Sequence, residues 1–131
     1  MQKTIINPWQ WQSGRGFEQA VEVAHGTHTL YCAGQTATDP QGVASQADMP
    51  AQLRSALDNV EAVLQKAGYT WPQVVRINYF TTSIAEFFLH FKAVVVNYLD
   101  EQGCRAASTL VEVSALASPS YLVEIEVTAV R

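Results

Sequence analysis

Three carboxylates stand among strand-forming residues near the end of the chain: Glu112, Glu124 and Glu126. Side chains alternate across a strand, so Glu124 and Glu126 fall on the same face of the run 121–130. That face also carries Leu122 and Thr128, whereas the other carries Val123, Ile125, Val127 and Ala129. A carboxylate on such a face could hold a water and move a proton. It could equally be solvated or paired with Arg76, Lys92 or Arg105.

Other kinds of reactive site find little support in the sequence. His25, His28 and His90 have no metal-ligand spacing, so we expect no metal site. Ser108, Ser114 and Ser118 have no neighbouring His or Asp pattern that would activate them, and the isolated Gly34 and Gly42 form no phosphate loop. We therefore expect no cofactor. Cys32 and Cys104 are interpreted as reduced thiols of a cytoplasmic protein.

Composition narrows the classes of partner. The chain has 131 residues, of which 48% are hydrophobic and only 15% charged, which favours one domain that hides apolar surface by oligomerising. The net charge is −4 and the eight basic residues are scattered singly, so nucleic acid is a poor expectation. Neither a signal peptide nor a membrane span is indicated, which predicts a cytoplasmic location.

The first third of the chain predicts an irregular lead-in over residues 1–16, then a hairpin. Its strands are expected at 17–23 and 27–33, joined by a turn at His25-Gly26. The segment 36–43 contains Asp39-Pro40-Gln41-Gly42 and is expected to be a loop.

The remainder predicts two helices and three strands. Leu53, Leu57, Val60 and Leu64 recur at helical spacing, which indicates a helix from about Asp48 to Lys66 that ends at Gly68. A strand at 74–82 precedes a second helix from Ser83 to Gly103, with Glu86 completing a capping box. Strands follow at 108–116 and 121–130, joined by a turn at 117–120.

The predicted order β-β-α-β-α-β-β defines a single α+β domain, 1–131, with one sheet and two helices on one face. The uncovered face would carry apolar residues from several strands and cannot be left in water. We therefore expect it to meet copies of itself.

Several short motifs resemble those of the Rid family (RidA/YjgF, endoribonuclease L-PSP type). They occur in the family's order and spacing: Cys32-Ala33-Gly34-Gln35, Asp39-Pro40-Gln41-Gly42, Leu57-Asp58-Asn59-Val60, Val111-Glu112-Val113 and Leu122-Val123-Glu124-Ile125-Glu126. The resemblance implies a chorismate-mutase-like fold and a homotrimer with three clefts between subunits. It also implies a small-molecule ligand, because well-known members hydrolyse reactive enamines and imines to keto acids and ammonia.

The resemblance also shows where this chain departs from the family. The substrate-gripping arginine is expected four residues before Glu112, and that position is Ser108. Arg105 lies three residues earlier, where a slip by an odd number turns a side chain to the wrong face. It could hold an anion only if the strand bulged. The chain is thus interpreted as a member that lacks the usual arginine.

Four further positions replace polar family residues by less polar ones. Phe17 stands for a tyrosine, Ala33 for a frequent serine, Phe91 for a frequent asparagine and Leu110 for a frequent cysteine. Glu124 alone matches the family's catalytic set, so it is the candidate catalytic residue. The expected ligand site comprises Phe17, Ala33, Phe91, Ser108 and Leu110.

These residues predict a Rid-type hydrolase, or deaminase, of a small reactive enamine, imine or related labile metabolite. Amino-acid-derived imines are expected to be poor substrates, because no fixed positive charge awaits their carboxylate at Ser108. The alternative is a non-catalytic trimer that binds a small molecule in the same clefts. An endoribonuclease or translation inhibitor, suggested only by the family's older name, ranks last.

Overall fold

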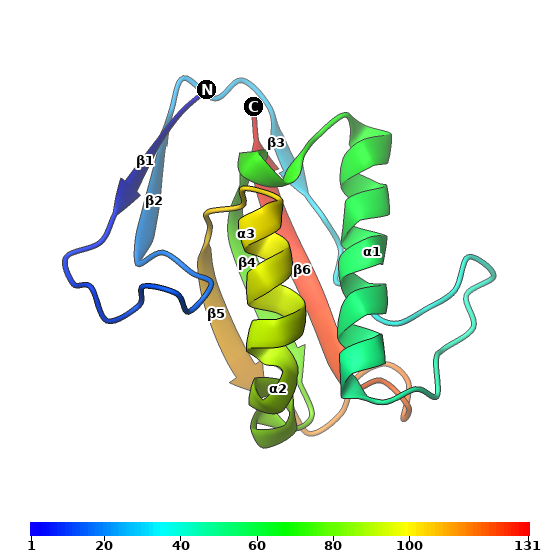
Figure 1. Cartoon of the computed structure of the whole chain (residues 1–131). Helices are drawn as coiled ribbons and strands as arrows, with labels where there is room; N and C mark the ends of the chain where they lie inside the picture. The colour runs from blue at the N-terminus through cyan, green and yellow to red at the C-terminus, as the bar shows by residue number, and fades with distance from the viewer.

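Two helical segments cover one face of a four-stranded sheet, and a two-stranded sheet stands beside it (Figure 1). The computed structural model describes the whole chain, residues 1–131. The larger sheet has the strand order β3-β6-β4-β5. β4 is parallel to β5 and antiparallel to β6, which also pairs with β3. The bounds are β3 Thr29–Tyr31, β4 Val74–Thr81, β5 Ala107–Glu112 and β6 Val123–Val130.

The first helix, α1 (Met49–Ala67), forms where the sequence predicted it. Asp48 is the N-cap, and its side chain accepts a hydrogen bond from the Ala51 N–H at 3.2 Å. Pro50 lies in the first turn, where its missing N–H costs nothing. Gly68 ends the helix in the left-handed conformation, with φ of 76°, which only glycine adopts without strain.

The second helix runs from Ile84 to Glu101 in three parts. The Ser83 hydroxyl accepts a hydrogen bond from the Glu86 N–H at 3.2 Å and so fixes the start of α2 (Ile84–His90). A π-helical segment, η2 (Phe91–Val96), follows, and α3 (Asn97–Glu101) completes the helix. One wide turn of this kind shifts the side chains after it around the helix axis.

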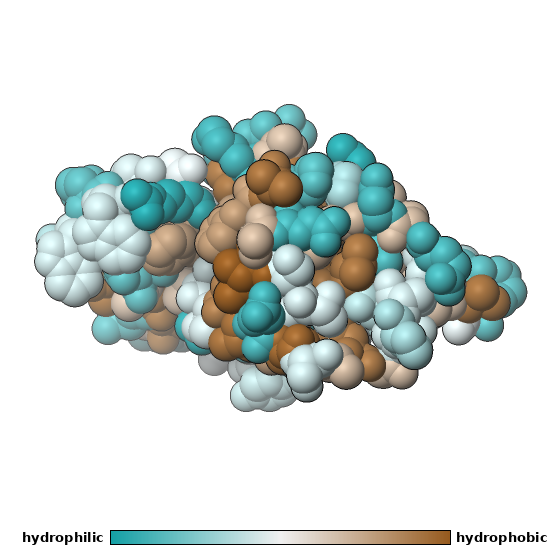
Figure 2. Space-filling view, turned by 90° about the horizontal axis from the view of Figure 1, so that it is seen from below, coloured by the Kyte–Doolittle hydropathy of each residue, from teal (hydrophilic) through white to brown (hydrophobic).

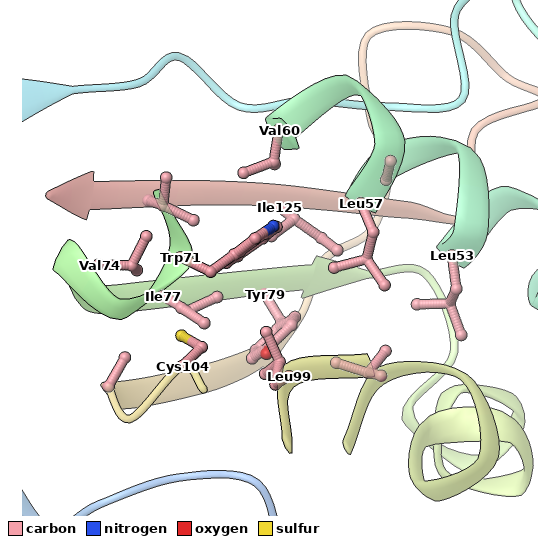
Figure 3. Packing of buried hydrophobic residues seen from close by; sticks show 14 of the residues in the cluster. Leu53, Leu57, Val60, Trp71, Val74, Ile77, Tyr79, Leu99, Cys104 and Ile125 are labelled. Atoms are coloured by element: carbon pink, nitrogen blue, oxygen red, sulfur yellow. The ribbon is translucent and has the colours of Figure 1, made fainter. Parts of the chain in front are cut away.

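The hydrophobic core lies between the helices and the larger sheet (Figure 3). The residues that alternation groups on one face of β6 form its inner face: Val123, Ile125, Val127 and Ala129 are each at most 2% exposed. The short 3₁₀ helix η1 (Trp71–Gln73) inserts Trp71 between α1 and the sheet. Burial of these side chains supplies most of the driving force for folding.

The irregular lead-in predicted over 1–16 is wrong for residues 2–6, whereas residues 7–16 contain no helix or strand. The predicted hairpin 17–23/27–33 is wrong in its pairing, although β2 and β3 lie close to the two predicted strands. Residues Gln2–Ile6 form β1, which pairs antiparallel with β2 (Ala20–Ala24). β3 pairs with β6 instead, because the chain changes direction at His25, which has a φ of 59°, and crosses to the larger sheet. The short alternation in β1 has no partner nearby in sequence, so local reading could not recognise it. The observed order therefore begins with three strands.

The last two strands lie apart, although the sequence places them next to each other along the chain. β4 separates β5 from β6, and β5 ends at Glu112 rather than residue 116. The connection over 113–122 contains the predicted turn, in which the Tyr121 N–H donates to the Ser118 carbonyl at 3.1 Å. β5 can run parallel to β4 because the second helix supplies a crossover long enough for parallel pairing.

None of the helices has the length and apolar character that crossing a bilayer requires.

Candidate functional site

A pocket of about 450 Å³ lies between the second helix, β5 and the loop before β2. Seven of its eleven lining residues are hydrophobic, and none carries a carboxylate. The lining consists of Gly14, Arg15, Phe17, Tyr79, Phe87, Phe88, Phe91, Lys92, Val96, Ser108 and Leu110. Four of the ligand-site residues expected from sequence are thus brought together: Phe17, Phe91, Ser108 and Leu110.

The β4–β5 register directs two of these side chains into the pocket. Ser108 lies opposite Ile77, and Leu110 lies opposite Tyr79. Ile77 and Tyr79 are buried against the helices, so Ser108 and Leu110 face the same side of the sheet. At the position where the family resemblance implies an arginine, the pocket therefore presents a neutral hydroxyl.

Aromatic rings form the opposite wall. The Phe91 ring lies 5.0 Å from that of Phe87 and 5.7 Å from that of Tyr79, measured between centroids. Phe88 adds a ring 6.1 Å from Phe91 and is 58% exposed. Figure 2 shows apolar side chains interspersed with polar ones on this end of the molecule, where α2 lies. Such contacts hold the wall in one arrangement before any ligand arrives.

The loop that closes the pocket packs directly against η2. A Cβ atom on Gly16 would lie 2.8 Å from Cγ2 of Val96 and 3.6 Å from Cζ of Phe91. Gly16 also has a φ of 78°, which favours glycine. Both the backbone conformation and the close contact with η2 therefore require glycine at this position. Phe17 follows directly and enters the pocket lining. The close approach of loop and helix thus positions one wall.

Two cations at this pocket were not anticipated from the sequence. Arg15 and Lys92 both line it, and both are exposed. The only ion pair in the chain joins Arg105 to Glu18, so neither pocket cation has a carboxylate partner. The Arg15 guanidinium lies 5.7 Å from the centre of the Trp11 ring. The signal was present in Gly14-Arg15-Gly16, where one charged residue stands between two loop-forming glycines.

Tyr79 lines the pocket with its ring and has a buried hydroxyl. Its side chain is 2% exposed, and its hydroxyl has no hydrogen-bond partner in the chain. Burial raises the pKa of Tyr79 far above its usual value, so the phenol stays protonated. A buried hydroxyl without a hydrogen-bond partner destabilises the fold.

Arg105 lies in a neighbouring polar cleft of about 390 Å³ and does not line the apolar pocket. Its Nε donates to the Glu18 carboxylate at 2.7 Å, and the Asn7 amide donates to the same carboxylate. Burial opposes ionisation of Glu18, but these hydrogen bonds outweigh it and lower the pKa of Glu18. β5 begins at Ala107 without a bulge that could redirect Arg105.

Ala33 and Glu124 lie outside the pocket. Glu124 is paired across the sheet with Phe80 and points away from the helices, whereas Ser108 points toward them. The Glu124 carboxylate lies over Gly34, since a Cβ there would come 2.0 Å from its Oε1. Within one chain, therefore, the candidate catalytic carboxylate and the pocket are on opposite faces of the sheet.

The two other strand carboxylates have structural partners. Oε1 of Glu112 accepts a hydrogen bond from the Ile84 N–H at 2.9 Å, at the first turn of α2. Oε1 of Glu126 accepts one from the Asn78 amide at 2.9 Å across the sheet. The structural interpretation thus holds for both, with partners other than Arg76, Lys92 and Arg105. No group of three His, Cys, Asp or Glu side chains is arranged to hold a metal.

Known proteins resemble the chain over most of its length. Residues 12–131 match the sequence profile of the family described as Endoribonuclease L-PSP. A RutC family protein of Synechocystis is 37% identical over 77% of each chain. The 2-iminobutanoate/2-iminopropanoate deaminase of Escherichia coli is 29% identical over 78% of this chain and 79% of its own length.

The fold is shared with solved structures as well. A Rid family protein from Yersinia pestis, described as of unknown function, is 32% identical. It superposes with a TM-score of 0.88 over 100% of both chains. The likeness therefore includes the N-terminal segment that pairs as β1 and β2.

Proposed function

Because the chain belongs to the Endoribonuclease L-PSP family, which includes the Rid proteins, we propose that it hydrolyses a small reactive enamine, imine or related labile metabolite. The observation that carries the proposal is the convergence of Phe17, Phe91, Ser108 and Leu110 on one largely apolar pocket. These are the positions at which the family resemblance implies substrate contact. The deaminase name of the Escherichia coli relative agrees with this class of reaction.

The pocket of one chain needs a carboxylate from elsewhere. Glu124 faces away from the helices, on a sheet face that also exposes Tyr31 (79%) and Val111 (40%). Exposed apolar side chains of this kind favour a protein partner. We place Glu124 of one copy at the pocket of the next in a homotrimer, so that the catalytic cleft lies between subunits.

The reaction then needs one acid–base group and one water. Glu124 takes a proton from the water as the water oxygen bonds to the imine carbon. It passes that proton to the imine nitrogen, which receives the π electron pair, and a carbinolamine forms. Glu124 then takes the proton of the carbinolamine hydroxyl and delivers it to the nitrogen as the C–N bond breaks, so that ammonia leaves, the carbonyl product remains and Glu124 is ionised again. An apolar wall around the water limits competing solvent.

The substrate class follows from Ser108. A short 2-imino acid holds its carboxylate close to the reacting carbon, where an arginine on β5 could bind it through two parallel hydrogen bonds. Ser108 offers only a neutral hydroxyl at that point. We therefore expect 2-iminobutanoate and similar compounds to be hydrolysed slowly.

Glu124→Gln tests the mechanism. Ammonia release from imines generated in situ by an amino-acid oxidase should fall at least about a hundredfold, as expected when an acid–base group is removed. Glu126→Gln, on the same face of the same strand, should retain activity, and both variants should keep the oligomeric state in analytical ultracentrifugation. Undiminished turnover in Glu124→Gln would refute the assignment, as would a wild-type protein that sediments as a monomer.

A second function is favoured by one observation, the absence of any carboxylate among the residues lining the pocket of a single chain. A trimer that only binds a small molecule would need no acid–base group. Thermal-shift measurements with labile metabolites separate the two functions, since a binder is stabilised by its ligand without forming product. Stabilisation that decays as product accumulates would favour the hydrolase.

A further inference from the structure

Two cations without a carboxylate partner, Arg15 and Lys92, both lie in the lining of the apolar pocket. The chain has a net charge of −4, yet Arg15 and Lys92 line this pocket with no acidic residue beside them. In the polar cleft next to it the cation has a partner, because Arg105 forms an ion pair with Glu18. Two cations without a partner at the rim of an apolar cavity are complementary to a molecule that is apolar at one end and negative at the other.

We propose that the pocket binds an aromatic or branched apolar molecule with a single carboxylate, which Arg15 holds at the rim with Lys92 beside it. The apolar body lies against the wall of Phe17, Phe87 and Phe91. This inference rests on the proposed function and names its substrate class. A volume of about 450 Å³ falls within the range of about 300–1,000 Å³ typical of small-molecule pockets. The anion is held by a loop instead of by β5, so the carboxylate sits away from Ser108.

The loop holds Arg15 ready for this role. The backbone N–H of Arg15 donates to the Gln12 carbonyl at 3.0 Å. The guanidinium carbon of Arg15 lies 5.7 Å from the centre of the Trp11 ring. A ring face contacts the flat side of a guanidinium and leaves its N–H groups free at the edge. Those groups match the two oxygens of a carboxylate. Gly16, packed against η2, fixes the loop on the other side.

Binding of two matched, unreactive probes tests the charge. In isothermal titration calorimetry, 3-phenylpropanoate should bind roughly tenfold more tightly than the neutral 3-phenylpropanamide, as hydrogen bonds to a charged group allow. Arg15→Gln should remove most of this preference, and Lys92→Gln part of it. Arg105→Gln, which changes a nearby arginine outside the pocket, should leave it intact. Equal binding of both probes to the wild-type protein overturns the proposal, and so does a preference that survives Arg15→Gln.

Since neither probe reacts, their binding is independent of hydrolysis. Tight binding together with unaltered turnover in Glu124→Gln would refute the proposed mechanism and leave this inference standing.

Discussion

Two clefts meet at the start of β5 and share Gly14 and Phe17, yet they treat charge in opposite ways. The polar cleft holds Arg105 in an ion pair with Glu18, at 2.7 Å. The apolar pocket holds Arg15 with an aromatic ring nearby and no counter-charge. The two arginines are alike in chemistry and differ only in whether the chain itself supplies a partner.

The difference separates a structural contact from a binding one. Glu18 also donates its backbone N–H to the Ala106 carbonyl at 2.9 Å, so the Glu18–Arg105 pair fastens the N-terminal segment to the larger sheet. An arginine that is already paired with a carboxylate binds a second anion only weakly. Arg15 and Lys92 remain available at the exposed rim of the aromatic wall.

Placing a cation on β5 should change the apolar pocket most. Ser108→Arg puts a guanidinium where the family resemblance implies one, and we expect hydrolysis of 2-iminobutanoate to rise about 10- to 100-fold, the worth of one or two charge-assisted hydrogen bonds. Steady-state ammonia release measures the change. The gain should appear in kcat/KM, since the new contact binds substrate and transition state alike.

Ser108→Gln is the matched control for that variant. It places a long side chain without a charge at the same position on β5, opposite Ile77. Hydrolysis of 2-iminobutanoate should stay near the wild-type rate. Equal gains in both variants would mean that the larger side chain, and not its positive charge, accounts for the effect.

Closing the space between loop and helix tests how the pocket is built. Gly16→Ala should lower the free energy of unfolding by about 1–3 kcal/mol, because the new Cβ meets Val96 and the φ of 78° is strained for alanine. Gly14→Ala has a similar φ of 74° but open space around the Cβ, so its cost should be about 1 kcal/mol. Urea denaturation of both variants gives the comparison. Equal losses would show that the close approach to η2 contributes nothing.

Local signals predicted the elements that carry them. α1 was recognisable because its apolar stripe runs between two clear end signals, Asp48 at the start and Gly68 at the end. Strict alternation in β6 grouped its buried residues on one face, because successive side chains of a strand point to opposite sides of the sheet. The spacing of the family motifs indicated one ligand site, and four of its expected residues line the same pocket: Phe17, Phe91, Ser108 and Leu110.

Features that depend on distant pairing were not predictable from local patterns. β1 is recognisable only through β2, and the insertion of β4 between β5 and β6 has no local signature. Arg15 was missed for the same reason, because its place at the pocket depends on a glycine fitting against η2 some eighty residues further along the chain. The unpartnered hydroxyl of Tyr79 was not predictable either, since strand alternation does not show whether a buried hydroxyl has a hydrogen-bond partner.

The smallest effect concerns the polar cleft and is best seen as a pH dependence. The pKa of Glu18 is lowered in the folded chain from an ordinary value of 4.5, so its ionised form stabilises the fold. This contribution is complete above about pH 5 and disappears as the pH falls below 4.5 through the lowered value. Glu18→Gln should therefore cost about 1 kcal/mol near neutral pH, and the difference from wild type should shrink on acidification.

Urea denaturation at a series of pH values measures that difference, with Glu22→Gln, an exposed residue of β2, as the control. The apolar pocket should be unaffected, so Glu18→Gln should keep the preference of the wild-type protein for 3-phenylpropanoate over its amide. If Glu18→Gln instead altered that preference, the freed Arg105 would have to reach the neighbouring pocket. The division between a satisfied arginine and an available one would then fail, because a ligand could use either of them.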